Sequence, residues 1–142
     1  MTQAAVKSPR EPGSDALTRG VRVRVRPEYL PEHSEPAKSQ FVFGYRVRIT
    51  NEGAGPVRLV SRRWVIVDGE GDERIVEGEG VIGQQPVIPP GEAFAYASYC
   101  PLTTAWGTME GVYRMTPTDE REPPFEAVVA RFFLIAPGMQ HG

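Results

Sequence analysis

Valine and arginine alternate along VRVRVR, from Val21 to Arg26, and this period of two is typical of a half-buried β-strand. The alternation returns in FVFGYRVRIT (41–50), where aromatic and branched residues would face inward and arginines outward. Five more segments read as strands because they are rich in β-branched and aromatic residues, and the first of them is expected to contain a bulge near Ser61. These five segments are 56–68, 73–83, 94–100, 108–117 and 125–137.

About seven strands are therefore predicted, with most of the 14 prolines and 15 glycines at their junctions and no helical periodicity. This pattern favours an all-β fold, an antiparallel β-sandwich of the immunoglobulin or fibronectin type III kind, with a closed barrel as the alternative. Pro27 is expected to end the first strand and 28–40 to form a long surface loop. We expect a flexible N-terminal extension over 1–19, one domain over 20–137 and a tail over 138–142.

Composition limits the class of protein. The 142 residues are 40% hydrophobic and 24% charged, as in an ordinary globular domain. The single cysteine, Cys100, cannot form an internal disulfide, which fits a reducing compartment. No apolar run suits a signal peptide or a membrane-spanning helix, so we expect a cytoplasmic protein without a membrane partner.

The segment GEGVIG matches the pattern G-x-G-x-x-G with Gly78, Gly80 and Gly83. In a dinucleotide site a helix follows these glycines, and its N-terminus holds the pyrophosphate. Here QQPVIPP follows, and its prolines exclude a helix. A kinase-type glycine loop also lacks support, because no lysine follows Lys38. The favoured interpretation is a loop shape that requires glycine, with phosphate binding as the alternative.

Metal and catalytic motifs are weak. DGEGDERIVEGE (68–79) resembles a calcium loop in its acids but has Glu73 where that loop requires glycine. Loose Mg²⁺ or Co²⁺ binding at Glu77 and Glu79 is the remaining metal alternative, against a solvated hairpin. The two histidines, His33 and His141, show no zinc spacing with each other or with the cysteine. No nucleophile motif occurs, so we expect no enzymatic activity, no cofactor and no structural metal.

Arginines are the more informative feature. Arg22, Arg24, Arg46 and Arg48, together with Arg26 and Arg58, occupy the outward positions of predicted strands. If those strands are neighbours, one sheet has a basic face that requires acidic partners, a bound phosphate-type anion or an acidic protein surface. Nucleic acid is not expected, because the net charge is −2 and no RNA-binding aromatic motif occurs.

Four segments together, in their order and spacing, resemble the ApaG family. They are VRPEYLPEHSEP, NEGAGPVRLVSRRWVIVDGEG, VEGEGVIGQQPVIPPGEAFAYASYCPL and GTMEGVYRM. The resemblance covers roughly 20–137 and includes the three glycines, so chance does not explain them. It implies a fibronectin type III-like sandwich in a bacterial cytoplasmic protein linked to cobalt and magnesium resistance. It brings no established catalytic residues, and related eukaryotic domains look like protein-interaction modules.

The sequence thus predicts a non-enzymatic binding module for a protein partner, with an indirect effect on divalent-cation tolerance. Tyr29 and Trp106 are aromatic candidates for the protein interface, or else partly buried anchors of loops. The alternative is binding of polyphosphate or a nucleotide–metal complex by the arginines and the glycine loop. A homodimer through an edge strand remains open.

Overall fold

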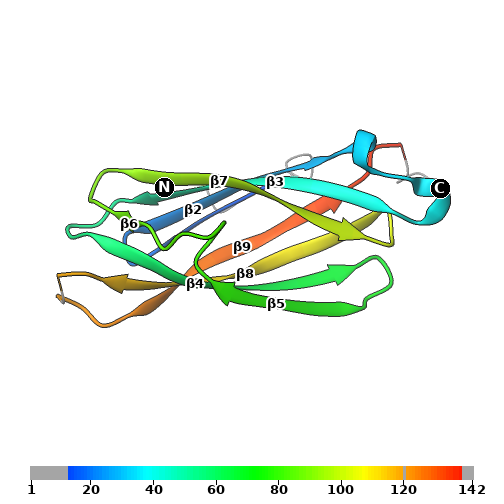
Figure 1. The fold of residues 1–142 in the computed structure, drawn as a ribbon. Helices are drawn as coiled ribbons and strands as arrows, with labels where there is room; N and C mark the ends of the chain where they lie inside the picture. Colours follow the sequence, from blue (N-terminus) through cyan, green and yellow to red (C-terminus); the bar gives the residue numbers. More distant parts are fainter. Residues whose placement is uncertain (1–12, 120, 139–142) are drawn as a thin grey trace, which may run out of the picture.

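The computed structural model describes residues 13–119 and 121–138 of the chain. It consists of β-strands joined by turns, with two short 3-10 helices (Figure 1). The strands are β1 (Ser14–Thr18), β2 (Val21–Tyr29), β3 (Phe41–Asn51), β4 (Val57–Asp68), β5 (Glu73–Glu79), β6 (Val87–Ile88), β7 (Ala93–Leu102), β8 (Trp106–Pro117) and β9 (Phe125–Ile135). The 3-10 helices are η2 (Pro31–His33) and η3 (Pro36–Lys38).

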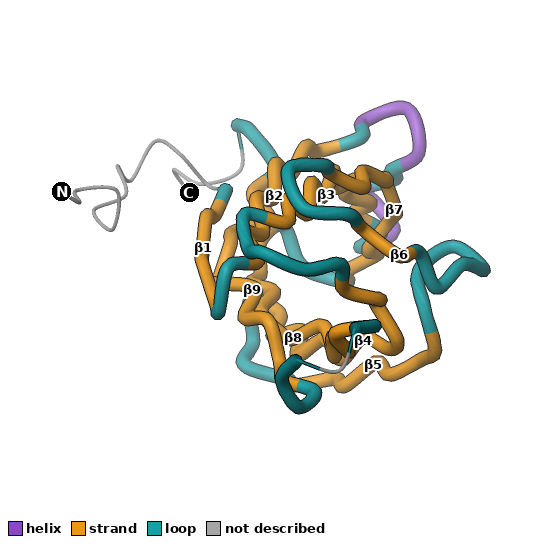
Figure 2. The backbone as a smooth tube through the Cα atoms, turned by 90° about the vertical axis from the view of Figure 1, so that its left-hand side faces the viewer, coloured by secondary structure: helices purple, strands orange, loops and turns teal. Residues whose placement is uncertain are grey.

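Two antiparallel sheets pack face to face, so the predicted all-β sandwich is confirmed. The first sheet has the order β1-β2-β3-β7, and the second has the order β5-β4-β8-β9, with the short β6 also paired to β4. Figure 2 looks along the strands and shows the two layers, with β1 and β9 side by side at one margin. The amide of Val128 donates to the hydroxyl of Thr18 there, at 3.1 Å, and links the two sheets.

The core lies between the sheets because the long strands alternate buried apolar side chains with outward ones, which are polar along much of β2 and β3. Val21, Val23 and Val25 of β2 are at most 5% exposed, while the arginines between them face outward. At the centre, the Trp64 ring packs edge-on against three other aromatic rings at centroid distances of 5.5 to 5.9 Å. These rings belong to Tyr45, Tyr113 and Phe132.

The structure has nine strands rather than about seven, because β1 and β6 were not predicted. The predicted extension over 1–19 is therefore wrong for its last part, in which Ser14–Thr18 pair with Val25 to Val21. This strand has few apolar residues, and backbone hydrogen bonds to β2 hold it in the sheet. Such bonds leave no hydrophobic pattern in the sequence, so the strand was not predicted. Residues 1–12 of the predicted extension, and 139–142 of the predicted tail, lie outside the described residues.

Pro27 does not end its strand, since β2 continues to Tyr29. The pairing of β2 with β1 stops at Val25, two residues before the proline. Pro27 therefore needs no N–H to bond to β1, and the strand can continue along β3. The predicted bulge is confirmed, because the register of β4 against β8 shifts between Leu59 and Ser61. Within the described part of the chain, no helix has the length and apolar character to span a membrane.

Candidate functional site

The register of β2 against β3 gathers the predicted arginines on the outer face of the first sheet. Arg24 lies directly opposite Arg48, and Arg26 lies directly opposite Arg46. We call these four residues the arginine face. Arg58 is not part of it, because it lies on β4 in the second sheet. Two like-charged pairs directly opposite each other destabilise a sheet, by about 0.2–1 kcal/mol per pair.

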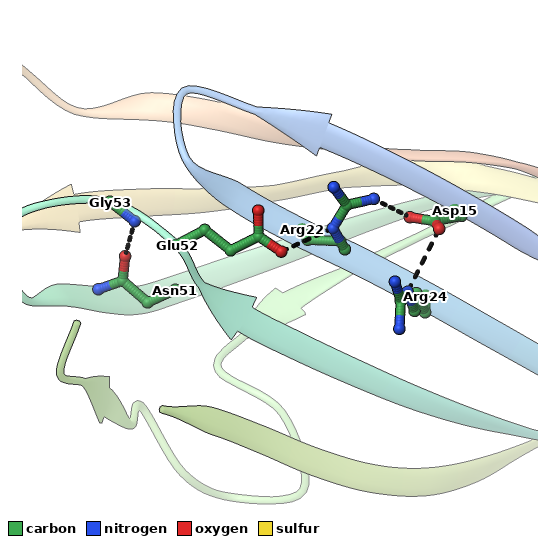
Figure 3. Close-up of polar contacts among 6 residues, drawn as sticks. All are labelled: Asp15, Arg22, Arg24, Asn51, Glu52 and Gly53. Carbon is green, nitrogen blue, oxygen red and sulfur yellow. Dashed lines mark hydrogen bonds and ion pairs between the residues drawn. The ribbon is translucent and has the colours of Figure 1, made fainter. Parts of the chain in front are cut away.

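Acids neutralise one side of this face. Asp15 of β1 accepts hydrogen bonds from Arg22 at 3.0 Å and from Arg24 at 3.2 Å, and Glu52 accepts one from Arg22 at 2.7 Å (Figure 3). The bonds to Glu52 and Asp15 raise the pKa of the Arg22 guanidinium above its ordinary value. Arg22, a predicted anion ligand, is therefore already held between two carboxylates of the protein.

The other side of the arginine face keeps its charge. Arg26, Arg46 and Arg48 are exposed and form no ion pair with any described residue. A shallow groove of about 830 Å³ crosses the sheet from β1 to β7 and includes all four arginines of the face. At its β7 side the groove is lined by Ala95 and Ala97. The groove is thus basic toward β3 and β7 and neutralised toward β1.

A buried asparagine holds the turn that carries Glu52. Asn51 is 1% exposed, and its side-chain amide donates to the carbonyls of Gly55 and Ile88 at 2.9 and 2.8 Å. Its side-chain oxygen accepts the Gly53 amide at 2.9 Å (Figure 3). Because this buried side chain is bonded on both its donor and acceptor sides, it fixes the turn after β3 and so the position of Glu52 beside Arg22.

Sequence reasoning missed Asp15 and Glu52 as partners of the arginines. Asp15 falls in the segment predicted to be flexible, and its pairing depends on a strand with almost no hydrophobic signal. Glu52 directly follows β3 and could have been found, because a residue in the turn after a predicted strand lies near the start of an antiparallel neighbour.

The glycine motif forms a tight turn directly after β5, closed by an isolated bridge between Val81 and Gln84. Gly80 has φ +65°, Ile82 +41° and Gly83 +78°. The amide of Val81 donates to the carbonyl of Gln84 at 2.8 Å, and the amide of Gln84 returns a bond at 2.9 Å. Positive φ at both central residues, Ile82 and Gly83, is the mark of a type I′ hairpin turn. The amide of Gly80 is also engaged, with the carbonyl of Val60 at 2.7 Å.

Gly78 makes room for a side chain. A Cβ at this position would lie 2.8 Å from the Arg62 guanidinium, which crosses β5 and donates to the carbonyls of Glu79 and Gly80 at 3.3 and 2.7 Å. The motif therefore belongs to the β5 edge of the second sheet, whereas the arginine face belongs to the first. The structure does not bring the two halves of the predicted anion site together in one sheet.

The two aromatic candidates lie on different sheets. Tyr29 ends β2 and is half-buried, with its ring 5.4 Å from that of Phe43. Trp106 starts β8, is 49% exposed and packs against Gly69, where a Cβ would lie 2.8 Å from its indole nitrogen. They do not form one surface, and their roles at an interface stay predictions.

Chemistry outside the arginines is limited. Burial raises the pKa of the Cys100 thiol, which Arg74 offsets only in part, so the thiol is a poor nucleophile at neutral pH. In the 68–79 segment, the Asp68 carboxylate accepts the amides of Glu70 and Asp72, as in a solvated hairpin. Among residues 13–119 and 121–138, no three His, Cys, Asp or Glu side chains are placed to hold a metal ion.

Comparisons with known proteins agree with this architecture. The ApaG domain model matches residues 31–117. Protein ApaG of Anaeromyxobacter dehalogenans is 49% identical over 125 residues, which cover 88% of this chain and 97% of the relative. A crystal structure from Bordetella pertussis superposes with a TM-score of 0.80 at 46% identity, covering 87% of this chain and 98% of that one. The domain match spans more than half of the sequence and the relatives are covered almost completely, so the chain belongs to the ApaG family.

Proposed function

We propose that this protein is a non-enzymatic, cytoplasmic binding module that docks an acidic segment of a partner protein on the arginine face. The observation that carries the proposal is the pair of directly opposed arginine couples, three members of which have no carboxylate partner among the described residues. Like charges in register reduce the stability of the sheet, and an acidic ligand would remove that repulsion.

The surroundings of the face favour a protein over a small phosphate ligand. The groove is shallow and spread across four strands, and it lacks the convergent backbone amides that usually hold a phosphate. The amides of Gly80, Val81 and Gln84 in the glycine loop already donate to protein carbonyls. Polyphosphate or a nucleotide–metal complex is the second candidate, and it would depend on the arginines alone.

The link to cobalt and magnesium tolerance, which the family resemblance implies, would then act through the bound partner. The buried Cys100 thiol, with its raised pKa, supports the non-enzymatic part of the proposal. A dimer through a sheet edge is compatible with docking on the outer face.

The test is an NMR titration of backbone amides with hexaglutamate and, separately, with tripolyphosphate, each with and without Mg²⁺. The wild type is compared with the double variant Arg46→Ser and Arg48→Ser. A matched control, Arg58→Ser with Arg114→Ser, removes the same charge from exposed positions of the second sheet.

We expect saturable shifts in β2, β3 and β7 with hexaglutamate, weakened by salt, lost in the double variant and kept in the control. Response to tripolyphosphate but not to hexaglutamate would favour the second candidate. Shifts that the control variant abolishes equally would show that only net charge matters and would overturn the assignment to this face.

A further inference from the structure

The edge of β7 that faces away from β3 has unused backbone groups. In the antiparallel pair of β3 and β7, residues alternate between those that hydrogen-bond to the partner strand and those that point away from it. The amide of Asn51 donates to the carbonyl of Glu92, and this bond shows which residues of β7 belong to which set. The even-numbered residues of β7 therefore bond to β3, and Ala95, Ala97 and Tyr99 direct their N–H and C=O groups to the other edge. The carbonyl of Pro101 confirms this phase, since it accepts a bond from Arg74 of β5.

Along 95–99 this edge has no hydrogen-bond partner among the described residues. Figure 2 shows β7 at the margin of its layer, at the end of the order β1-β2-β3-β7. The edge closes at one end, where Pro101 lacks an N–H and Arg74 occupies its carbonyl at 3.2 Å. An open stretch of about five residues remains, enough for a short extended segment.

The side chains beside this edge connect it to the arginine face. Ala97 lies opposite Arg46, and Ala95 lies opposite Arg48. Both alanines line the same groove as the arginines. Because alanine is short, the guanidinium groups of β3 can extend over β7 toward the open edge. A strand placed there would lie about 10 Å from β3, two strand spacings, which an arginine and a glutamate span together.

We propose that the partner segment binds as an added strand along β7, with acidic residues at positions i and i+2 that pair with Arg46 and Arg48. This proposal rests on the proposed docking of an acidic segment and adds its conformation and spacing. Residues of an added strand opposite Ala95 and Ala97 point to the outer face, because side chains of directly paired residues share a face. The recognised element is thus acid-x-acid in extended form.

Two residues of the added strand beside the acids would turn inward: the one between the acids, opposite Tyr96, and the one beyond the acid paired with Ala97, opposite Ser98. On that side, β7 presents Ser98 to a cleft of about 350 Å³ at the open margin between the sheets. Trp64 also lines this cleft, and its buried indole N–H has no acceptor among the described residues. The cleft gives the partner side chain opposite Ser98, directly beyond the acid paired with Ala97, a place to sit. The arginines supply charge recognition, and the β7 backbone supplies the hydrogen bonds.

The experiment measures binding of fluorescein-labelled Thr-Glu-Val-Glu-Val-Glu-Thr, with blocked ends, by fluorescence anisotropy. Two control peptides share its charge. One has the same residues with the three glutamates adjacent, and one is N-methylated at alternate residues so that it cannot pair with an edge. The protein variants are Ala97→Pro, which blocks the edge, and the double variant Arg46→Ser with Arg48→Ser.

We expect the alternating peptide to bind at least about tenfold more tightly than both control peptides, because strand pairing adds several hydrogen bonds. Ala97→Pro should reduce its affinity to that of the controls, and the N-methylated peptide gives the same information if that variant does not fold. Equal binding of all three peptides, still lost in the arginine variant, would overturn strand addition and leave the proposed function standing. If hexaglutamate binds but the alternating peptide does not, strand addition is likewise overturned and the proposed function stands. If neither hexaglutamate nor the alternating peptide binds the wild type, both proposals are overturned.

Discussion

Replacing Gly80 by alanine tests whether the glycine motif is an element of architecture. Gly80 has φ +65°, and an added Cβ would lie 2.1 Å from the carbonyl oxygen of Gln84. Real Cβ atoms do not approach oxygen this closely, so the backbone of the turn must move. Gly83 is the matched control, because its φ is +78° but an added Cβ would meet nothing within 4 Å.

The structure gives a different magnitude for each change. A left-handed conformation costs an L-residue about 1–2 kcal/mol, which applies to both positions. Lower entropy of the unfolded chain offsets this by about 0.4–1 kcal/mol, so Gly83→Ala should lower the free energy of unfolding by about 1 kcal/mol. At Gly80 the displaced carbonyl also loses its bond from Val81, worth about 1 kcal/mol, and the shift adds strain. The total there is about 3 kcal/mol.

The assay is thermal unfolding followed by circular dichroism, with urea unfolding as a second measure. At about 3 °C per kcal/mol for a domain of this size, we expect Tm to fall by about 3 °C for Gly83→Ala and about 10 °C for Gly80→Ala. Equal losses, or a neutral Gly80→Ala, would refute the steric reasoning. The motif would then need another explanation, such as contact of Gly80 with a ligand.

Three further predictions concern charge and burial. Asp15→Asn should lower Tm by a few degrees in low salt and by less in high salt, because the lost pairs are surface ion pairs worth about 1 kcal/mol or less. Arg48→Thr should leave Tm unchanged or raise it by relieving repulsion from Arg24, while hexaglutamate binding weakens; a clear loss of stability would count against like-charge strain. Burial raises the pKa of Tyr96 and Tyr113, so stability should be full below about pH 9 and fall as pH rises through the ordinary tyrosine range, with the tyrosinate absorbance of these two buried residues appearing only on unfolding.

Much of the fold could be predicted because the dominant signal is local. Alternation in VRVRVR and FVFGYRVRIT assigns strand and face together, since a period of two leaves only one set of side chains to bury. The buried valines of β2 confirm that assignment. By contrast, β1 is held by hydrogen bonds to its neighbour rather than by its own apolar residues, and β6 is only two residues long. Neither strand has a pattern that distinguishes it from a loop.

The site could be predicted only in part because it depends on register. The sequence indicates that arginines face outward, but whether Arg24 meets Arg48 or a threonine depends on the length of the loop between the strands. The glycines were expected to shape a loop, which the positive φ of Gly80 and Gly83 confirms. The role of Gly78 could not be predicted from the sequence, because it depends on the position of the Arg62 guanidinium from the neighbouring strand.

The uneven neutralisation of the arginine face indicates where a partner would approach. If these arginines served stability alone, acids would be expected on both sides, because each opposed couple costs the sheet a fraction of a kcal/mol. Asp15 instead serves Arg22 and Arg24 at the β1 side. Toward β7, the neighbours of Arg46 and Arg48 are alanines, which neither pair with charge nor obstruct the edge. Uncompensated charge and an open backbone edge therefore coincide at one margin of the sandwich, and a single extended acidic segment would satisfy both.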